Sequence, residues 1–95
     1  MRITQGVTQG LLVKRVNPKY PKEARKEGIQ GVVILTAKIG KHGDIADLSV
    51  VSGDPLLAKA AMDAVKKWKY RPYLLLGQPV EVQTQIQVNF VLPAN

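Results

Sequence analysis

The C-terminal stretch VEVQTQIQVNFVL, Val80 to Leu92, decides the fold of this chain. Its even-numbered positions are mostly apolar, whereas its odd-numbered positions are polar as far as Asn89. A period of two is typical of a β-strand with one buried face and one solvated face. At about 3.3 Å per residue the stretch could reach about 40 Å, so we expect a long strand that the rest of the chain covers on one face.

The first half of the chain predicts a strand, a helix and a β-hairpin. Residues 11–16 (LLVKRV) could form a short strand, and Pro21 is well placed as the first residue of a helix that stops at Gly28. Residues 31–40 and 45–52 are rich in β-branched residues, which indicates two antiparallel strands joined by a tight turn.

The second half predicts one longer helix before the final strand. Asp54 is suited to be its N-cap and Pro55 its first residue, and we expect it to run to about Tyr70, with Pro72 ending it. Residues 74–79 then form a loop. Apolar residues at three- and four-residue steps give this helix an inward face, namely Leu57, Ala60, Ala61, Ala64, Val65 and Trp68.

The predicted order is therefore β-α-β-β-α-β. This is an α+β fold in which two helices cover one face of a small antiparallel sheet. Residues 1–10 are expected to be a loose N-terminal extension, and residues 11–95 a single domain. The expected structural core includes Leu35, Leu57, Val65, Trp68 and Tyr70.

The composition offers little for catalysis. The chain has 95 residues and no cysteine, which excludes disulfides, thiol catalysis and cysteine-bound zinc. The single histidine, His42, falls in the tight turn, where a solvated side chain is a simpler interpretation than a base or metal ligand. We therefore predict no enzyme activity, no metal and no cofactor. Because no apolar run could span a bilayer, the chain is expected to be cytoplasmic or a soluble piece of a longer protein.

The formal net charge of +7 raises the possibility of an anionic partner such as nucleic acid. An RNA-binding sheet of this topology displays aromatic side chains on its open face. Phe90, however, shares its side of the strand with Val88 and Leu92, which is the expected core side. Every Lys and Arg also lies at or before Arg71. Nucleic-acid binding is therefore the weaker hypothesis.

The final strand has the features of an open sheet edge. Edge strands are usually protected by lysine, proline or a bulge, because bare backbone groups recruit other chains. No proline, glycine or lysine occurs between Val80 and Leu92. Such an edge is suited to accept an extended peptide. Two alternatives stay open: the edge could be covered by residues 11–16 of the same chain or by a second copy.

From Leu11 to Leu92 the sequence resembles the C-terminal domain family of TonB. The similarity rests on a Tyr-Pro before the first helix, a Trp-x-Tyr-x-Pro after the second, and the glycine spacing between them. The matching segments are N-P-K-Y-P (17–21), A-R (24–25), I-Q-G-V-V (29–33), G-D-I (43–45), V-V-S-G (50–53), A-A-M-D-A-V-K-K-W-K-Y-R-P (60–72) and the closing strand.

The resemblance implies an energy transducer rather than an isolated domain. Such proteins are anchored in the inner membrane, cross the periplasm through a proline-rich stretch, and end in this domain. The domain binds the TonB box of outer-membrane receptors as an added strand, while the partners ExbB and ExbD, which meet the N-terminal region, supply work from the proton gradient. This work drives active uptake, with siderophores among the cargo. A TonB-like structural or signalling module is the alternative that the resemblance leaves open.

Carried over by position, the resemblance places the receptor peptide near Tyr20 and Pro21 and along the closing strand. Asn17 stands where the best-known members have Gln, and residues 74–82 (LLLGQPVEV) form a longer insert. Trp68 and Tyr70 match an aromatic pair of the family, although the helical position of Trp68 favours a core role. The peptide-pairing strand comprises Val82, Gln83, Thr84, Gln85, Ile86, Gln87, Val88, Asn89 and Phe90.

The hairpin also predicts a second interaction surface. Val33, Leu35, Leu48 and Val50 are expected to face the core. The intervening residues Val32, Ile34 and Val51 would then leave apolar surface on the open face of the sheet. A homodimer is therefore a further expectation.

Overall fold

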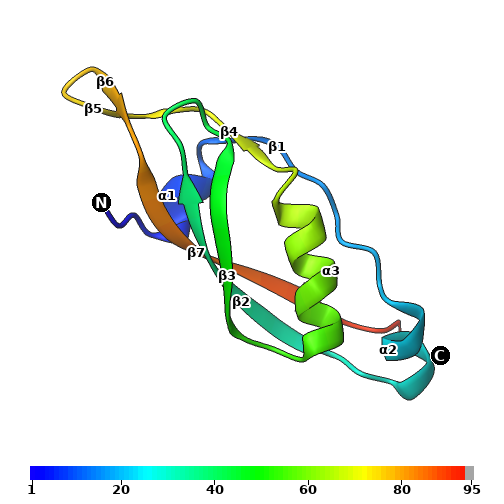
Figure 1. The fold of residues 1–95 in the computed structure, drawn as a ribbon. Helices are drawn as coiled ribbons and strands as arrows, with labels where there is room; N and C mark the ends of the chain where they lie inside the picture. Colours follow the sequence, from blue (N-terminus) through cyan, green and yellow to red (C-terminus); the bar gives the residue numbers. More distant parts are fainter. Residues whose placement is uncertain (94–95) are drawn as a thin grey trace.

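The computed structural model describes residues 1–93 and has ten elements (Figure 1). In chain order these are α1 (Gln5–Gln9), β1 (Leu12–Lys14), α2 (Lys22–Glu27), β2 (Gly31–Ile39), β3 (Ile45–Ser52), α3 (Pro55–Val65), β4 (Lys69–Tyr70), β5 (Tyr73–Leu75), β6 (Gln78–Val80) and β7 (Val82–Phe90). No helix among the described residues is long and apolar enough to cross a membrane. The predicted α+β class is confirmed.

A three-stranded antiparallel sheet in the order β3-β2-β7 forms the centre of the fold. β7 pairs with β2 without a register shift, from Gly31 opposite Phe90 to Ile39 opposite Val82. β2 is the middle strand, so β7 lies at one edge of the sheet and β3 at the other. The pattern of the closing strand therefore predicted that it is a strand with one buried face, whereas its pairing with β2 comes from the structure.

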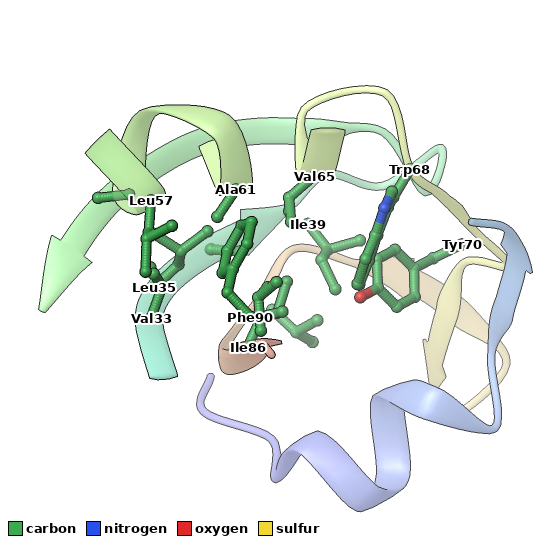
Figure 2. Packing of buried hydrophobic residues seen from close by; sticks show 14 of the residues in the cluster. Val33, Leu35, Ile39, Leu57, Ala61, Val65, Trp68, Tyr70, Ile86 and Phe90 are labelled. Carbon is green, nitrogen blue, oxygen red and sulfur yellow. The ribbon is translucent and has the colours of Figure 1, made fainter. Parts of the chain in front are cut away.

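The core lies between this sheet and α3, which crosses the face of β2 and β3 (Figures 1 and 2). Alternate residues of β2 and β7 point toward the helix, as the period of two requires. All five predicted core residues are buried, and Figure 2 shows them among their neighbours: Leu35, Leu57, Val65, Trp68 and Tyr70.

β3 is less well covered than predicted. Val50 pairs with the buried Leu35 and borders a groove beside α3, so it faces the helix side as expected, but its side chain is 43% exposed. Leu48 is only half-buried. The reason is that β3 lies at the sheet edge, where a single helix covers the middle strand more completely than its neighbour. On the open face, Val32 and Val51 are exposed as predicted.

The predicted first strand forms, but outside the central sheet. β1 pairs with β4 instead, with Leu12 opposite Tyr70. This pairing exists because α3 ends at Val65 and not near Tyr70, which corrects the predicted length of the helix. The extended chain after α3 is held by two backbone bonds, from the Tyr70 amide to the Gly43 carbonyl at 2.9 Å and from the Arg71 amide to the Leu11 carbonyl at 2.7 Å.

The stretch predicted as a loop before the last strand is a β-hairpin, β5–β6, that projects from the domain (Figure 1). Its two turn residues, Leu76 and Gly77, have φ values of 51° and 78°. Positive φ at both central positions is the geometry of the turn that suits two-residue hairpins. Leucine is unusual at such a position, which is why the sequence did not predict the turn.

Residues 5–9 form a short helix, α1, that packs beside β7. Thr4 is its N-cap, and the Thr4 hydroxyl accepts a hydrogen bond from the Val7 amide at 3.4 Å. Thr8 is fully buried, and its hydroxyl lies 3.4 Å from the hydroxyl of Thr84 on β7. α1 was not expected from the sequence, and it places the N-terminus next to the edge of the sheet.

Candidate peptide-binding edge

The backbone of β7 divides its hydrogen-bonding groups between two sides. In an antiparallel pair, consecutive residues point their amide and carbonyl groups alternately toward the partner strand and away from it. The Gln83 and Gln87 amides bond to the N-terminal segment and not to β2, which fixes the direction of the alternation. The residues whose backbone groups point outward are therefore Gln83, Gln85, Gln87 and Asn89.

The side chains of β7 alternate between the two faces of the sheet, one buried and one exposed. The even-numbered residues are buried against α3 and α1, and their backbone groups bond to β2. Gln85, Gln87 and Asn89 are exposed, and Gln83 is half-buried. The edge is therefore polar and uncharged, and the strand is anchored to the core by a row of buried side chains: Val82, Thr84, Ile86, Val88 and Phe90.

The beginning of this edge is occupied by the chain's own N-terminus. The Gln83 amide donates to the Met1 carbonyl at 2.7 Å, and the Ile3 amide donates to the Gln83 carbonyl at 2.8 Å. Together these bonds form a parallel bridge between Arg2 and Gln83. Residues 11–16, one of the two coverings considered from the sequence, do not lie here.

The second half of the edge is more open. A groove runs between α1 and β7 and is lined by Gln5, Gly6 and Gln9 on one side and by Gln87 and Asn89 on the other. The Gln87 amide donates to the side-chain oxygen of Gln5 at 3.2 Å. Within residues 1–93, no partner from outside the sheet bonds to the outward amides of Gln85 and Asn89.

Tyr20 lies at the far end of β7. Its ring meets that of Phe90 edge to face, with centroids 5.6 Å apart and planes at 85°. Its hydroxyl donates to the Ile29 carbonyl just beyond α2. Pro21 is the N-cap residue of α2, one position before the helix rather than its first residue. Tyr20 thus contacts β7 through its ring packing on Phe90, whereas its hydroxyl is already bonded to a carbonyl of the same domain.

Asn17 is not brought to the edge of β7. It is exposed, and it borders a groove formed with α3 residues such as Ala60 and Ala64. The segment from β1 to α2 runs along α3 (Figure 1). The predicted peptide contacts therefore lie in two places, one at the β7 edge and one beside α3.

The two aromatic residues after α3 belong to the fold. The Trp68 indole donates to the Val16 carbonyl at 2.8 Å, and the Arg15 guanidinium lies 5.5 Å from the centre of its ring. Burial raises the pKa of the Tyr70 hydroxyl to about 12, and the nearby Arg15 charge partly opposes that rise. Both side chains pack in the core, as predicted, although Trp68 lies after the end of α3 and not on its inward face.

Most of the chain, including the β7 edge, matches a family of known proteins. The sequence model of the family described as Gram-negative bacterial TonB protein C-terminal matches residues 16–92. The chain belongs to the TonB C-terminal family. The resemblance read from the sequence is thereby confirmed.

Two relatives named Protein TonB support this assignment to the TonB C-terminal family. A Protein TonB from Xanthomonas campestris pv. campestris is 37% identical over 90 residues, and the match covers 92% of this chain and 40% of the relative. A Protein TonB from Vibrio cholerae is 34% identical over 99 residues, covering 94% of this chain and 41% of the relative. The chain thus spans about two fifths of the length of these curated relatives.

Two solved structures share the fold of this TonB domain. The solution NMR structure of the Pseudomonas aeruginosa TonB CTD matches with a TM-score of 0.74 and 26% identity, covering 88% of this chain and 87% of the other. A structure of the tonb2 protein from Vibrio anguillarum matches with a TM-score of 0.66 and 34% identity, covering 88% and 82%.

Sequence reasoning located the edge of this TonB domain but missed residues 1–5 as its occupant. The segment is too short for a periodic pattern, and its contacts with Gln83 join residues about eighty positions apart. The one local signal was Thr4, a residue type favoured at the start of a helix.

Proposed function

We propose that this domain is the receptor-binding end of an energy transducer. In this proposal its β7 edge binds the TonB box of an outer-membrane receptor as an added strand. The full-length protein would be anchored in the inner membrane, would extend through the periplasm, and would receive work from the proton gradient through ExbB and ExbD. Membership of the TonB C-terminal family supports the transducer role.

The observation that carries the peptide-binding step is the row of outward backbone groups on β7. Gln85 and Asn89 present amides without a partner from outside the sheet within residues 1–93. The groove beside α1 gives an extended peptide space to approach Gln87 and Asn89. An unprotected edge of this kind is the geometry that strand addition requires.

The energies are compatible with reversible capture. A backbone hydrogen bond contributes about 0.5–1.5 kcal/mol net, so four to six of them contribute about 2–9 kcal/mol before ordering costs. A dissociation constant of 1 μM corresponds to about 8 kcal/mol. Strand addition alone therefore gives weak binding, and side-chain contacts must supply the rest. Such an affinity suits a coupling that must form and release repeatedly.

The decisive experiment is an NMR titration of the labelled domain with a synthetic TonB-box peptide. The amides of Gln85, Gln87 and Asn89 should shift most. Gln85→Pro removes one outward amide without removing a bond to β2, so it should weaken binding about two- to tenfold while the helices stay folded. Gln85→Ala is the matched control, because it removes the same side chain and keeps the amide.

Equal binding by Gln85→Pro and Gln85→Ala would show that the β7 backbone is not the site. A titration in which shifts gather around Asn17 and α3 would instead place the peptide on the other surface that the family resemblance marked.

We also propose that the open face supports self-association. Val32 and Val51 are 45% and 54% exposed on that face, which leaves apolar area available to a second copy. Sedimentation equilibrium at rising concentration should show dimers, and Val32→Thr with Val51→Thr should reduce them. A strict monomer at high concentration would contradict this proposal.

A further inference from the structure

Residues 1–5 occupy the same backbone groups that a guest peptide would use. Gln83 uses its amide toward Met1 and its carbonyl toward Ile3, at 2.7 and 2.8 Å. The Gln87 amide is taken by the Gln5 side chain at 3.2 Å. Since an amide proton makes one good hydrogen bond at a time, a guest strand cannot pair with Gln83 or Gln87 until these contacts open.

The segment is held in place from its C-terminal side. Thr4 caps α1, and its carbonyl also accepts a bond from the Thr8 amide at 3.1 Å. Thr8 itself is buried against Thr84. This anchor keeps residues 1–5 close to β7 even when their own bonds to the strand break, so their effective concentration at the edge is high.

The contacts of residues 1–5 themselves are shallow. Met1, Arg2 and Thr4 are exposed, and Ile3 and Gln5 are only half-buried. A segment with few buried apolar contacts opens locally at a much smaller free-energy cost than the whole domain. Thr4 and Gln5 are the N-cap and first residue of α1, so the backbone that opens is that of residues 1–3, and the Gln5 side chain can leave the Gln87 amide without disturbing α1 or the core.

We propose that residues 1–5 are a built-in ligand of the β7 edge, which a receptor peptide must displace before it can pair along the start of the strand. The identity of the guest rests on the proposed function above. The apparent dissociation constant of the guest then equals its intrinsic value divided by the fraction of molecules with an open edge. Residues 1–5 consequently set the affinity and restrict pairing to extended segments that can replace them.

Two proline variants separate the loss of the Ile3–Gln83 backbone bond from the stiffening that any proline causes in this segment. The Ile3 amide donates to Gln83, so Ile3→Pro removes that bond. The Arg2 amide makes no backbone bond within residues 1–93, so Arg2→Pro stiffens the same segment without this loss and serves as the control. Hydrogen exchange should show a less protected Gln83 amide in Ile3→Pro only.

The affinity for a synthetic TonB-box peptide should follow the same order. Loss of one backbone bond corresponds to about a two- to tenfold change in an equilibrium constant. Ile3→Pro should therefore bind the peptide about two- to tenfold more tightly than the parent chain, and Arg2→Pro should bind like the parent. A variant lacking residues 1–3, which keeps Thr4 and α1, should show at least the gain of Ile3→Pro.

A reversible disulfide that holds the N-terminal segment on β7 should have the opposite effect and weaken peptide binding. Arg2 and Gln83 are bridge partners, and the chain contains no other cysteine, so Arg2→Cys with Gln83→Cys can form a single defined disulfide. The oxidised protein should bind the peptide at least tenfold more weakly than the same protein after reduction. The reduced form is its own control for the loss of both side chains.

The outcomes distinguish this inference from the proposed function. If the parent, Ile3→Pro and the shortened variant bind the peptide equally, displacement is wrong and strand addition stands. If the oxidised lock binds as well as its reduced form, the same conclusion holds. If none of the variants binds the peptide, the proposed function is wrong as well. Unchanged exchange of the Gln83 amide in Ile3→Pro would show that residues 1–5 do not hold the edge.

Discussion

The indole N–H of Trp68 donates a hydrogen bond of 2.8 Å to the carbonyl oxygen of Val16, 52 positions earlier in the chain. This bond joins the turn after α3 to the segment that leads from β1 to α2. The Arg15 guanidinium packs over the same ring, 5.5 Å from its centre. Trp68 therefore fixes the path of a long connection that no regular sheet or helix holds.

Replacing Trp68 with phenylalanine should lower the free energy of unfolding by about 1–3 kcal/mol. The variant loses one hydrogen bond, leaves the Val16 carbonyl without its donor, and keeps part of the apolar contact. Urea denaturation measures the change. Lys66→Ala, which removes only an exposed pair with Asp63, is the control and should change stability by less than about 0.5 kcal/mol. A folded Trp68→Phe that lost peptide affinity would make Trp68 a binding residue instead.

The parts of the fold that the sequence predicted are those set by local patterns. The alternation in β7 identified its buried row, and Asp54 followed by Pro55 marked the start of α3, where the Asp54 carboxylate accepts a bond from the Leu56 amide at 2.9 Å. Both signals act within a few residues, so they can be recognised without knowing the rest of the structure.

The parts that could not be predicted depend on distant contacts. α3 ends early because Trp68 and Tyr70 bond to Val16 and Gly43, neither of which is near them in sequence. The same holds for the site: the open edge followed from the composition of β7, whereas its occupant is set by bonds between Gln83 and the first three residues. Propensity carries no information about such pairs.

Gly43 should be among the positions least tolerant of a side chain. Its φ is +85°, and a Cβ built there would lie 1.7 Å from the Tyr70 carbonyl oxygen, which is backbone and cannot move freely. Gly43→Ala should therefore cost about 2–5 kcal/mol of stability through strain and the loss of close β4 packing. Gly6→Ala is the matched control, because its Cβ meets nothing within 4 Å and alanine favours the helix. Thermal unfolding of both variants checks the contrast, and equal stability would contradict the close approach.

The tip of the β5–β6 hairpin should be stabilised by a better turn residue. Leu76 has a φ of 51° and is 96% exposed, so it bears the strain of a left-handed conformation without packing in return. Leu76→Asn should raise stability by about 0.5–1 kcal/mol, since asparagine tolerates this conformation. Gly77→Ala should act in the opposite direction by about 1 kcal/mol. Differential scanning calorimetry measures both, and a destabilised Leu76→Asn would show that the leucine side chain contributes contacts.

Alkaline pH should weaken the fold through Tyr70. Burial raises the pKa of its hydroxyl to about 12 in the folded state, against about 10 in the unfolded chain. Below pH 10 both states keep the proton, and the contribution to stability is constant. Between pH 10 and 12 the unfolded state releases the proton first, so stability falls as the pH rises and the loss reaches about 3 kcal/mol above pH 12.

Tyr70→Phe isolates this effect, because it removes the titrating hydroxyl and keeps the ring in the core. Lysine side chains also titrate in this range, but they do so in both proteins, so their contribution cancels in the difference between the two stability curves. That difference, measured by urea denaturation from pH 8 to 12, should be flat up to about pH 10 and should then move in favour of Tyr70→Phe. Parallel curves throughout would mean that the folded protein does not hold the Tyr70 proton, and that the chain after α3 opens to solvent far more readily than the burial of Tyr70 beside Trp68 in the core (Figure 2) implies.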